Sequence, residues 1–124
     1  SAASDVYKRQ SYKNMELHII DRISIPSILP SENSFMDYNL KRSIIKKVGI
    51  NKDDVEKYNI KEDAENKRTT WDINADRENP LVVNFTDQEL AYLKGACEKL
   101  SDTPAPDYLW DTVEKIYEAA QTTA

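Results

Sequence analysis

The stretch Leu81-Val82-Val83-Asn84-Phe85-Thr86-Asp87-Gln88-Glu89-Leu90 holds the two clearest structural signals in the chain. Residues 81–85 favour β structure and follow Asn79-Pro80, which predicts a strand. Thr86 and Glu89 have the spacing of a capping box, in which each side chain accepts a hydrogen bond from a backbone N–H at the start of a helix. The stretch therefore predicts a strand that leads directly into a helix.

Apolar spacing predicts helices on both sides of this stretch. Downstream, the capped helix carries the stripe Leu90, Leu93, Cys97 and Leu100. Upstream, Ser34 is expected to begin a helix over 34–48, with Gly49 as its C-cap. Further helices are expected over 21–29, with Asp21 as N-cap, over 51–58, and from Asp107 to about residue 120.

A β-hairpin is predicted between these helices. Residues 58–61 and 69–73 favour strands and enclose the polar segment 62–68, which suits a long charged turn. Together with the strand at 81–85, the hairpin is expected to form one small antiparallel sheet packed with about four helices. The predicted fold class is therefore α+β, and residues 15–124 are expected to form a single domain.

The first 14 residues, SAASDVYKRQSYKN, lack apolar periodicity and the apolar centre of a signal peptide. The leading SAASDVYKRQ resembles translated adapter sequence at the ends of reading frames from assembled metagenomic reads. We expect residues 1–14 to be a disordered leader or an artefact without function, and Met15 to be the native start. Without this segment, 14 Lys and Arg face 21 Asp and Glu, so the net charge of −5 becomes −7.

The scarcity of reactive residues excludes several kinds of site. One His, one Cys and two Gly exclude zinc ribbons, Cys–His proteases, disulfide frameworks and glycine-rich phosphate loops. The acidic balance argues against nucleic acid as a direct partner, because phosphate binding needs clustered Lys and Arg. No apolar run approaches the ~18–20 residues of a membrane span. We expect no metal, cofactor or small-molecule ligand.

Three conspicuous single residues each have a structural interpretation. Cys97 lies on an apolar stripe, so we expect a buried small hydrophobic side chain. Gly95 lies in the middle of a helix, where glycine costs about 1 kcal/mol relative to alanine, and is expected to permit close packing of a neighbouring element. His18 has no partner that the sequence reveals.

The aromatic residues give the sharper functional hypothesis. Tryptophan and tyrosine are enriched at protein interfaces because each buries a large area while keeping a polar tip. Trp110 and Tyr117 flank the apolar face of the last helix, Trp71 falls in the hairpin, and Tyr38 lies on the helix over 34–48. These four residues are the candidate interaction site, with packing against the core or the sheet as the alternative for Trp110 and Trp71.

The chain also resembles a family of small proteins encoded by tailed phages and prophages, over most of residues 15–118. The resemblance implies a phage-linked cytosolic protein and transfers no catalytic residue. The chain departs from the family pattern after Pro30, where Ser31-Glu32-Asn33 replaces a Glu-Gly turn, and at Pro26. The matching segments are Asp21-Arg22-Ile23, Ile28-Leu29-Pro30, Phe35, the helix Leu40–Val48, Asp54–Tyr58-Asn59-Ile60, Trp71-Asp72 and Phe85-Thr86–Glu89-Leu90.

Three functions remain open from the sequence. The favoured one is a non-enzymatic module that binds a host or phage protein or associates with itself as a homodimer. The second is an acidic inhibitor that competes for the nucleic-acid-binding surface of a host defence or replication protein. The third is an enzyme that uses paired carboxylates, which needs two close, desolvated carboxylates in one pocket. We expect location in the cytoplasm of a bacterial host, and association with a virion stays open.

Overall fold

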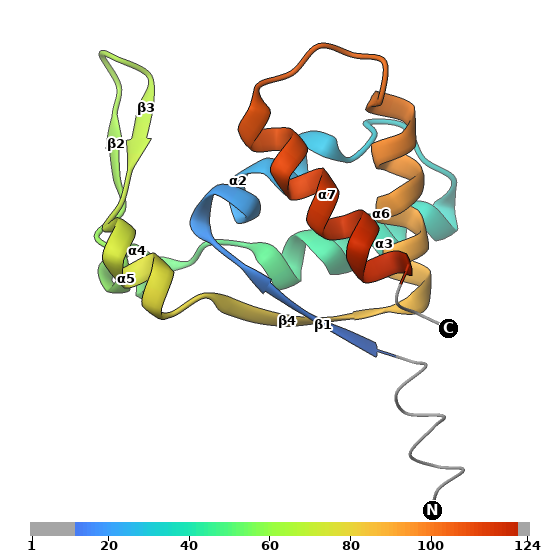
Figure 1. Ribbon diagram of the computed structural model, residues 1–124, viewed down its shortest axis with the longest axis horizontal. Coiled ribbons are helices and arrows are strands. Elements are labelled where there is room, and N and C mark those ends of the chain that lie inside the picture. The colour runs from blue at the N-terminus through green and yellow to red at the C-terminus, as the bar shows by residue number, and fades with distance from the viewer. Residues whose placement is uncertain (1–11, 122–124) are drawn as a thin grey trace, which may run out of the picture.

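The computed structural model describes residues 12–121, and the expectation of a disordered leader concerns residues that lie mostly outside this range. Within these residues the fold is α+β, with four helices of 10 to 15 residues, two helices of six residues and two antiparallel strand pairs (Figure 1). The elements are β1 (Tyr12–Leu17), α2 (Ile19–Ile28), α3 (Phe35–Val48), α4 (Lys52–Lys57), β2 (Lys61–Asp63), β3 (Arg68–Thr70), α5 (Ile73–Glu78), β4 (Leu81–Thr86), α6 (Asp87–Leu100) and α7 (Asp107–Gln121).

The central strand pair joins the start of the described chain to a strand about 70 residues later. Strand β4 confirms the strand predicted over 81–85, and it pairs antiparallel with β1 so that Met15 lies opposite Val83. Alternate side chains of this ribbon, Met15 and Leu17 on β1 with Val83 and Phe85 on β4, are buried under the helices. The period of two gives the ribbon one core face and one solvent face.

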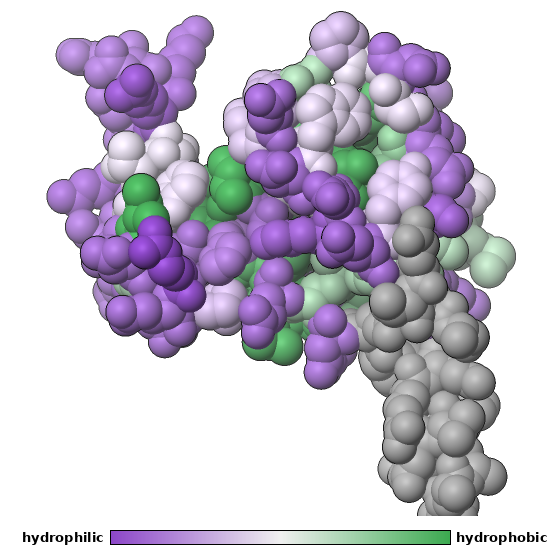
Figure 2. All heavy atoms as spheres, in the orientation of Figure 1, coloured by the Kyte–Doolittle hydropathy of each residue, from purple (hydrophilic) through white to green (hydrophobic). Residues whose placement is uncertain are grey.

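The expectation that β4 would join the hairpin in one sheet is wrong. Strands β2 and β3 pair only with each other, and all six of their residues are exposed. The hairpin projects from the body in Figure 1, and Figure 2 shows its outer end hydrophilic and its base close to neutral. Strands β2 and β3 are polar and have no apolar face to bury beside β4. Strand β1 has such a face, formed by Met15 and Leu17.

The boundary expected between residues 14 and 15 falls inside β1. Backbone pairing extends three residues upstream of Met15, because Tyr12, Lys13 and Asn14 lie opposite Thr86, Phe85 and Asn84. Residues 12–14, expected to belong to the leader, are therefore part of the strand pair.

Two details of the helices also differ from expectation. The first long helix begins after His18, and Asp21 is its third residue rather than its N-cap; the Asp21 carboxylate accepts a hydrogen bond from the His18 N–H at 3.0 Å. The strand expected over 69–73 ends at Thr70, and helix α5 begins at Ile73, with the Asp72 side chain accepting hydrogen bonds from two backbone N–H groups.

Helices α2, α3, α6 and α7 cover the β1–β4 ribbon and enclose one core (Figure 1). Helix α6 lies at its centre and packs against α3, α7 and β4. The capping box predicted for Thr86 and Glu89 is present, and so is the N-cap Ser34 of α3. The fully buried side chains at the centre include Ile25, Ile44, Phe85, Leu93 and Ile116.

Candidate functional site

The apolar stripe of α3 leaves the core toward the start of the helix. Val48 and Ile44 are fully buried, Leu40 is half-buried, and Met36, one turn further, is 74% exposed. Phe35 beside it is 78% exposed. Met36, Leu40, Ile44 and Val48 are spaced four residues apart and therefore share one helix face. The same face thus packs against the body at its C-terminal end and has no partner within the described chain at its N-terminal end.

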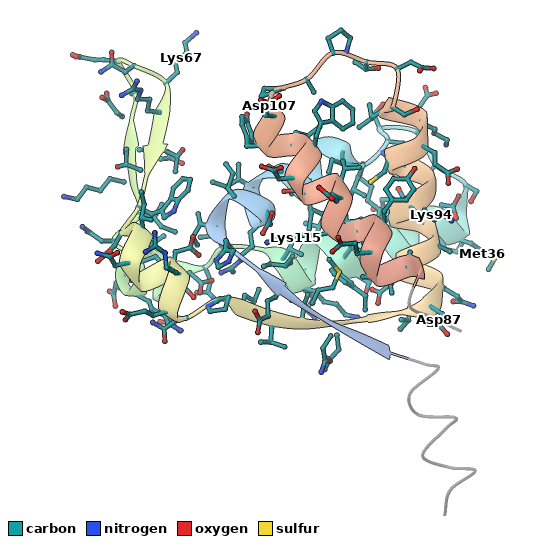
Figure 3. All side chains as sticks on the ribbon, in the orientation of Figure 1. Met36, Lys67, Asp87, Lys94, Asp107 and Lys115 are labelled. Atoms are coloured by element: carbon teal, nitrogen blue, oxygen red, sulfur yellow. The ribbon has the colours of Figure 1, made fainter. Side chains whose placement is uncertain are left out.

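The exposed end of this stripe borders a groove between α3 and α6 with a volume of about 790 Å³. Leu40 lines it from α3, and Ala91, Tyr92, Gly95 and Ala96 line it from α6. Figure 3 shows Met36, which also lines the groove, at the edge of the molecule, and Figure 2 shows a pale green apolar patch at the same place. We call this surface, together with Phe35, the α3–α6 groove.

Gly95 makes the floor of the groove open. The expectation that Gly95 permits close packing of another element is wrong, because a Cβ atom at this position would meet no atom within 4 Å. Ala91 lies one turn earlier on the same face, so two small residues form a depression on α6. The sequence placed Gly95 within a helix correctly. A glycine in a helix does not, however, show whether the space beside it is filled by another element of the chain or is open.

Hydrogen bonds fix the loop at one end of the groove. The Tyr92 hydroxyl donates to the Asn33 side chain at 2.6 Å, and the carbonyl of Pro30 accepts from Asn33 and from the Lys41 ammonium at 3.0 and 2.7 Å. Burial, together with the nearby negative charge of Asp37, raises the pKa of the Tyr92 phenol. Both effects favour the protonated phenol, which is the form that donates this bond.

Glu89 fixes the other end, where α3 and α6 are in contact. Its buried carboxylate accepts from the Thr86 N–H at 2.8 Å, from the Ser43 hydroxyl at 2.7 Å and from the Lys47 ammonium at 2.6 Å. Burial alone would raise the pKa of Glu89, but these donors and the charge of Lys47 outweigh it and lower the pKa. The capping box was predictable; its second task of joining α6 to α3 was not.

The four aromatic residues of the sequence hypothesis lie in separate places. Trp110 and Tyr117 on α7 are half-buried and pack against the core, and the Trp110 indole N–H donates to the carbonyl of Ala105 at 3.2 Å. Trp71 is half-buried between β3 and α5. Tyr38 is 47% exposed on α3, with the Arg42 guanidinium 5.7 Å from its ring centre. Among these four, only Tyr38 lies on α3 with the exposed residues Phe35 and Met36.

The basic run of α3 is divided among different contacts. Lys41 binds the Pro30 carbonyl, Lys47 binds Glu89, and Arg42 lies over Tyr38. Three of the four cations of this run are therefore directed to separate partners within the chain, so they do not form one continuous patch for phosphates.

A second cluster of polar residues surrounds the start of α2. The Asp21 carboxylate accepts from the Thr112 hydroxyl at 2.6 Å and from the Lys115 ammonium at 2.5 Å; Figure 3 labels Lys115 on α7. Asp76 accepts from the Ile19 N–H at 3.0 Å and lies 3.5 Å from Nδ1 of His18, which gives His18 the partner that the sequence did not reveal. Both carboxylates thus join elements that are far apart in the sequence.

The carboxylates of this cluster are occupied by contacts within the chain. The Asp21 carboxylate accepts three hydrogen bonds and Asp76 accepts one from a backbone N–H, so both carboxylates take part in contacts between elements. In residues 12–121, no group of three or more His, Cys, Asp or Glu side chains is arranged to hold a metal ion. None of the helices in this range is long and apolar enough to cross a membrane.

Comparison of the chain with protein-family models, with curated proteins and with solved structures finds no match.

Proposed function

We propose that the chain is a non-enzymatic protein-binding module and that the α3–α6 groove is its binding surface. The observation that carries this proposal is the course of one apolar stripe, from fully buried at Ile44 to 74% exposed at Met36, beside an open groove. Contiguous apolar surface rimmed by polar residues is typical of protein interaction sites.

The energetics of the exposed side chains support this proposal. Burial of one large apolar side chain contributes about 1.5–3 kcal/mol, and a few central anchors carry most of the binding energy of an interface. Phe35 and Met36 are both more than 70% exposed, so a partner would remove most of their surface from water. The groove floor at Gly95 gives such a partner room to insert a side chain.

The biological setting of the proposal comes from the sequence. The resemblance to phage and prophage proteins favours action in the cytoplasm of a bacterial host, and a single free cysteine suits a reducing compartment.

The proposal is tested by placing a photo-crosslinking residue at Met36 and, in a matched variant, at Val82. Val82 is also apolar and 56% exposed, but it lies on the solvent face of β4. We expect discrete protein adducts from position 36 and none of the same mass from position 82, in purified protein or in the host cytoplasm. If position 36 gives no adduct, or the same adducts as position 82, the proposal is wrong.

A further inference from the structure

We infer that the occupant of the α3–α6 groove is a second copy of this chain, arranged about a two-fold axis. This inference rests on the proposed function, because it names the partner of the same surface. In a two-fold dimer the same patch of both copies forms the interface, so the patch must be complementary to itself.

The shape of the groove meets this requirement. Met36 projects from α3 as an apolar knob on the wall of the groove, with the exposed Phe35 next to it in sequence, while Ala91 and Gly95 leave a depression on α6 that lines the same groove. A two-fold rotation that lays α3 of one copy along α6 of the other brings the knob of each copy to the depression of the other. Such contacts would continue the buried stripe of α3 across the interface.

The charges of the groove meet the same requirement. Asp37 on the α3 side and Lys99 on the α6 side both line the groove, and neither forms an ion pair within the described residues. In the two-fold arrangement, Asp37 of each copy lies on the side of Lys99 of the other, so the interface contains two opposite-charge pairs. This balance matters because each copy carries a net charge of −5, and acidic copies repel one another away from such a pairing.

Charge reversal tests this arrangement through the mass of the full chain, measured by light scattering and sedimentation over a range of concentrations. Asp37→Lys places two Lys–Lys contacts in the dimer, and Lys99→Asp places two Asp–Asp contacts. We expect each variant alone to weaken self-association by about tenfold or more, from typical energies of exposed ion pairs. Both residues are exposed, and circular dichroism checks that both variants fold.

The decisive measurement combines the two variants. In an equimolar mixture of Asp37→Lys and Lys99→Asp, each heterodimer contains two opposite-charge pairs, and so does the homodimer of the double variant. We therefore expect both the mixture and the double variant to recover wild-type association. Glu56→Lys and Lys52→Asp on α4, exposed and distant from the groove, are the matched control reversals and should leave the dimer unchanged.

The crosslinker at Met36 gives an independent readout. The inference expects an adduct of twice the chain mass, with the attached peptide derived from residues 88–99 of α6. A chain that stays monomeric to millimolar concentration, or a dimer indifferent to both charge reversals, overturns the inference. A monomer whose position 36 crosslinks to a different protein overturns only the inference; a position 36 that gives no adduct overturns the proposed function as well.

Discussion

At the scale of single residues, Glu89 shows how one side chain serves local and long-range structure together. Its carboxylate completes the capping box of α6 and also binds Ser43 and Lys47 of α3, with the residue only 2% exposed. A buried carboxylate is costly unless its oxygens are satisfied, and here three donors satisfy them. Removal of its charge should therefore weaken both the helix start and the α3–α6 contact.

We expect Glu89→Gln to lower the free energy of unfolding at pH 7 by about 1–3 kcal/mol, since the amide keeps the shape but loses the charge-assisted bonds. The pKa of Glu89 is lowered in the folded chain, so its contribution is complete above the ordinary glutamate pKa of about 4.5 and is lost as the pH falls through the lower folded value. Urea unfolding between pH 3 and 7 should therefore show a smaller loss of stability in acid for the variant than for wild type.

The matched control for this prediction is Glu98→Gln, an exposed glutamate on the same helix. It should change the free energy of unfolding at pH 7 by no more than ~0.5 kcal/mol. It should also leave the loss of stability between pH 7 and pH 3 as it is in wild type. Asp54, whose pKa is also lowered, keeps part of the acid sensitivity in all variants. An equal loss of stability in acid for wild type and Glu89→Gln would contradict the assignment.

Cys97 gives a second prediction at this scale. The thiol is fully buried, and burial raises its pKa to about 11. At pH 8 only about one thiol in a thousand is then a thiolate, which is the reactive form. We expect the native chain to react with a disulfide reagent far more slowly than the chain unfolded in guanidinium, with one equivalent bound after unfolding. Rapid labelling of the native chain would show that α6 opens or that the thiol is accessible.

At the scale of elements, the sequence was informative wherever the signal is local. Ser34, Asn51 and Thr86 are the N-caps of three helices as their side chains indicated, because a cap is set by residues three positions apart. Strand pairing is not local. Strands β1 and β4 are about 70 residues apart in sequence, and the residues of one strand do not indicate which other strand it will pair with. The groove was missed for the same reason, since Met36 and Gly95 meet only in the folded chain.

The first strand permits a test at this scale. We expect a chain that starts at Met15 to be less stable than one that starts at Tyr12 by about 1–3 kcal/mol, because it loses three positions of pairing with β4 at about 0.5–1.5 kcal/mol for each hydrogen bond. Thermal and urea unfolding of the two chains measures the difference. Equal stabilities would show that the domain needs nothing upstream of Met15.

At the scale of the whole molecule, residues 50–80 form an arm beside the helical body (Figure 1). The arm holds α4, the hairpin and α5, and its own centre is Tyr58, which is 2% exposed and donates to the Asn79 carbonyl. Buried polar contacts of the α2 region tie the arm to the body. Arg22 binds Asp54 at 2.7 Å together with the carbonyls of Val48 and Gly49, and Asp76 binds the Ile19 N–H.

We expect the arm to open locally while the body stays folded. Hydrophobic burial holds the body together, whereas single polar contacts join the arm to it. Arg22→Met replaces the guanidinium by an apolar side chain of similar length, and Asp76→Ala removes the acceptor of the Ile19 N–H. We expect either change to increase amide hydrogen exchange across 51–80 by about 10- to 100-fold, equivalent to about 1.4–2.8 kcal/mol, while α6 keeps its protection.

Asp53→Asn, an exposed change on α4, should leave exchange unaltered. If α6 loses protection together with the arm, the two parts open as one cooperative unit, and the polar contacts at α2 are then as integral to the fold as the core itself.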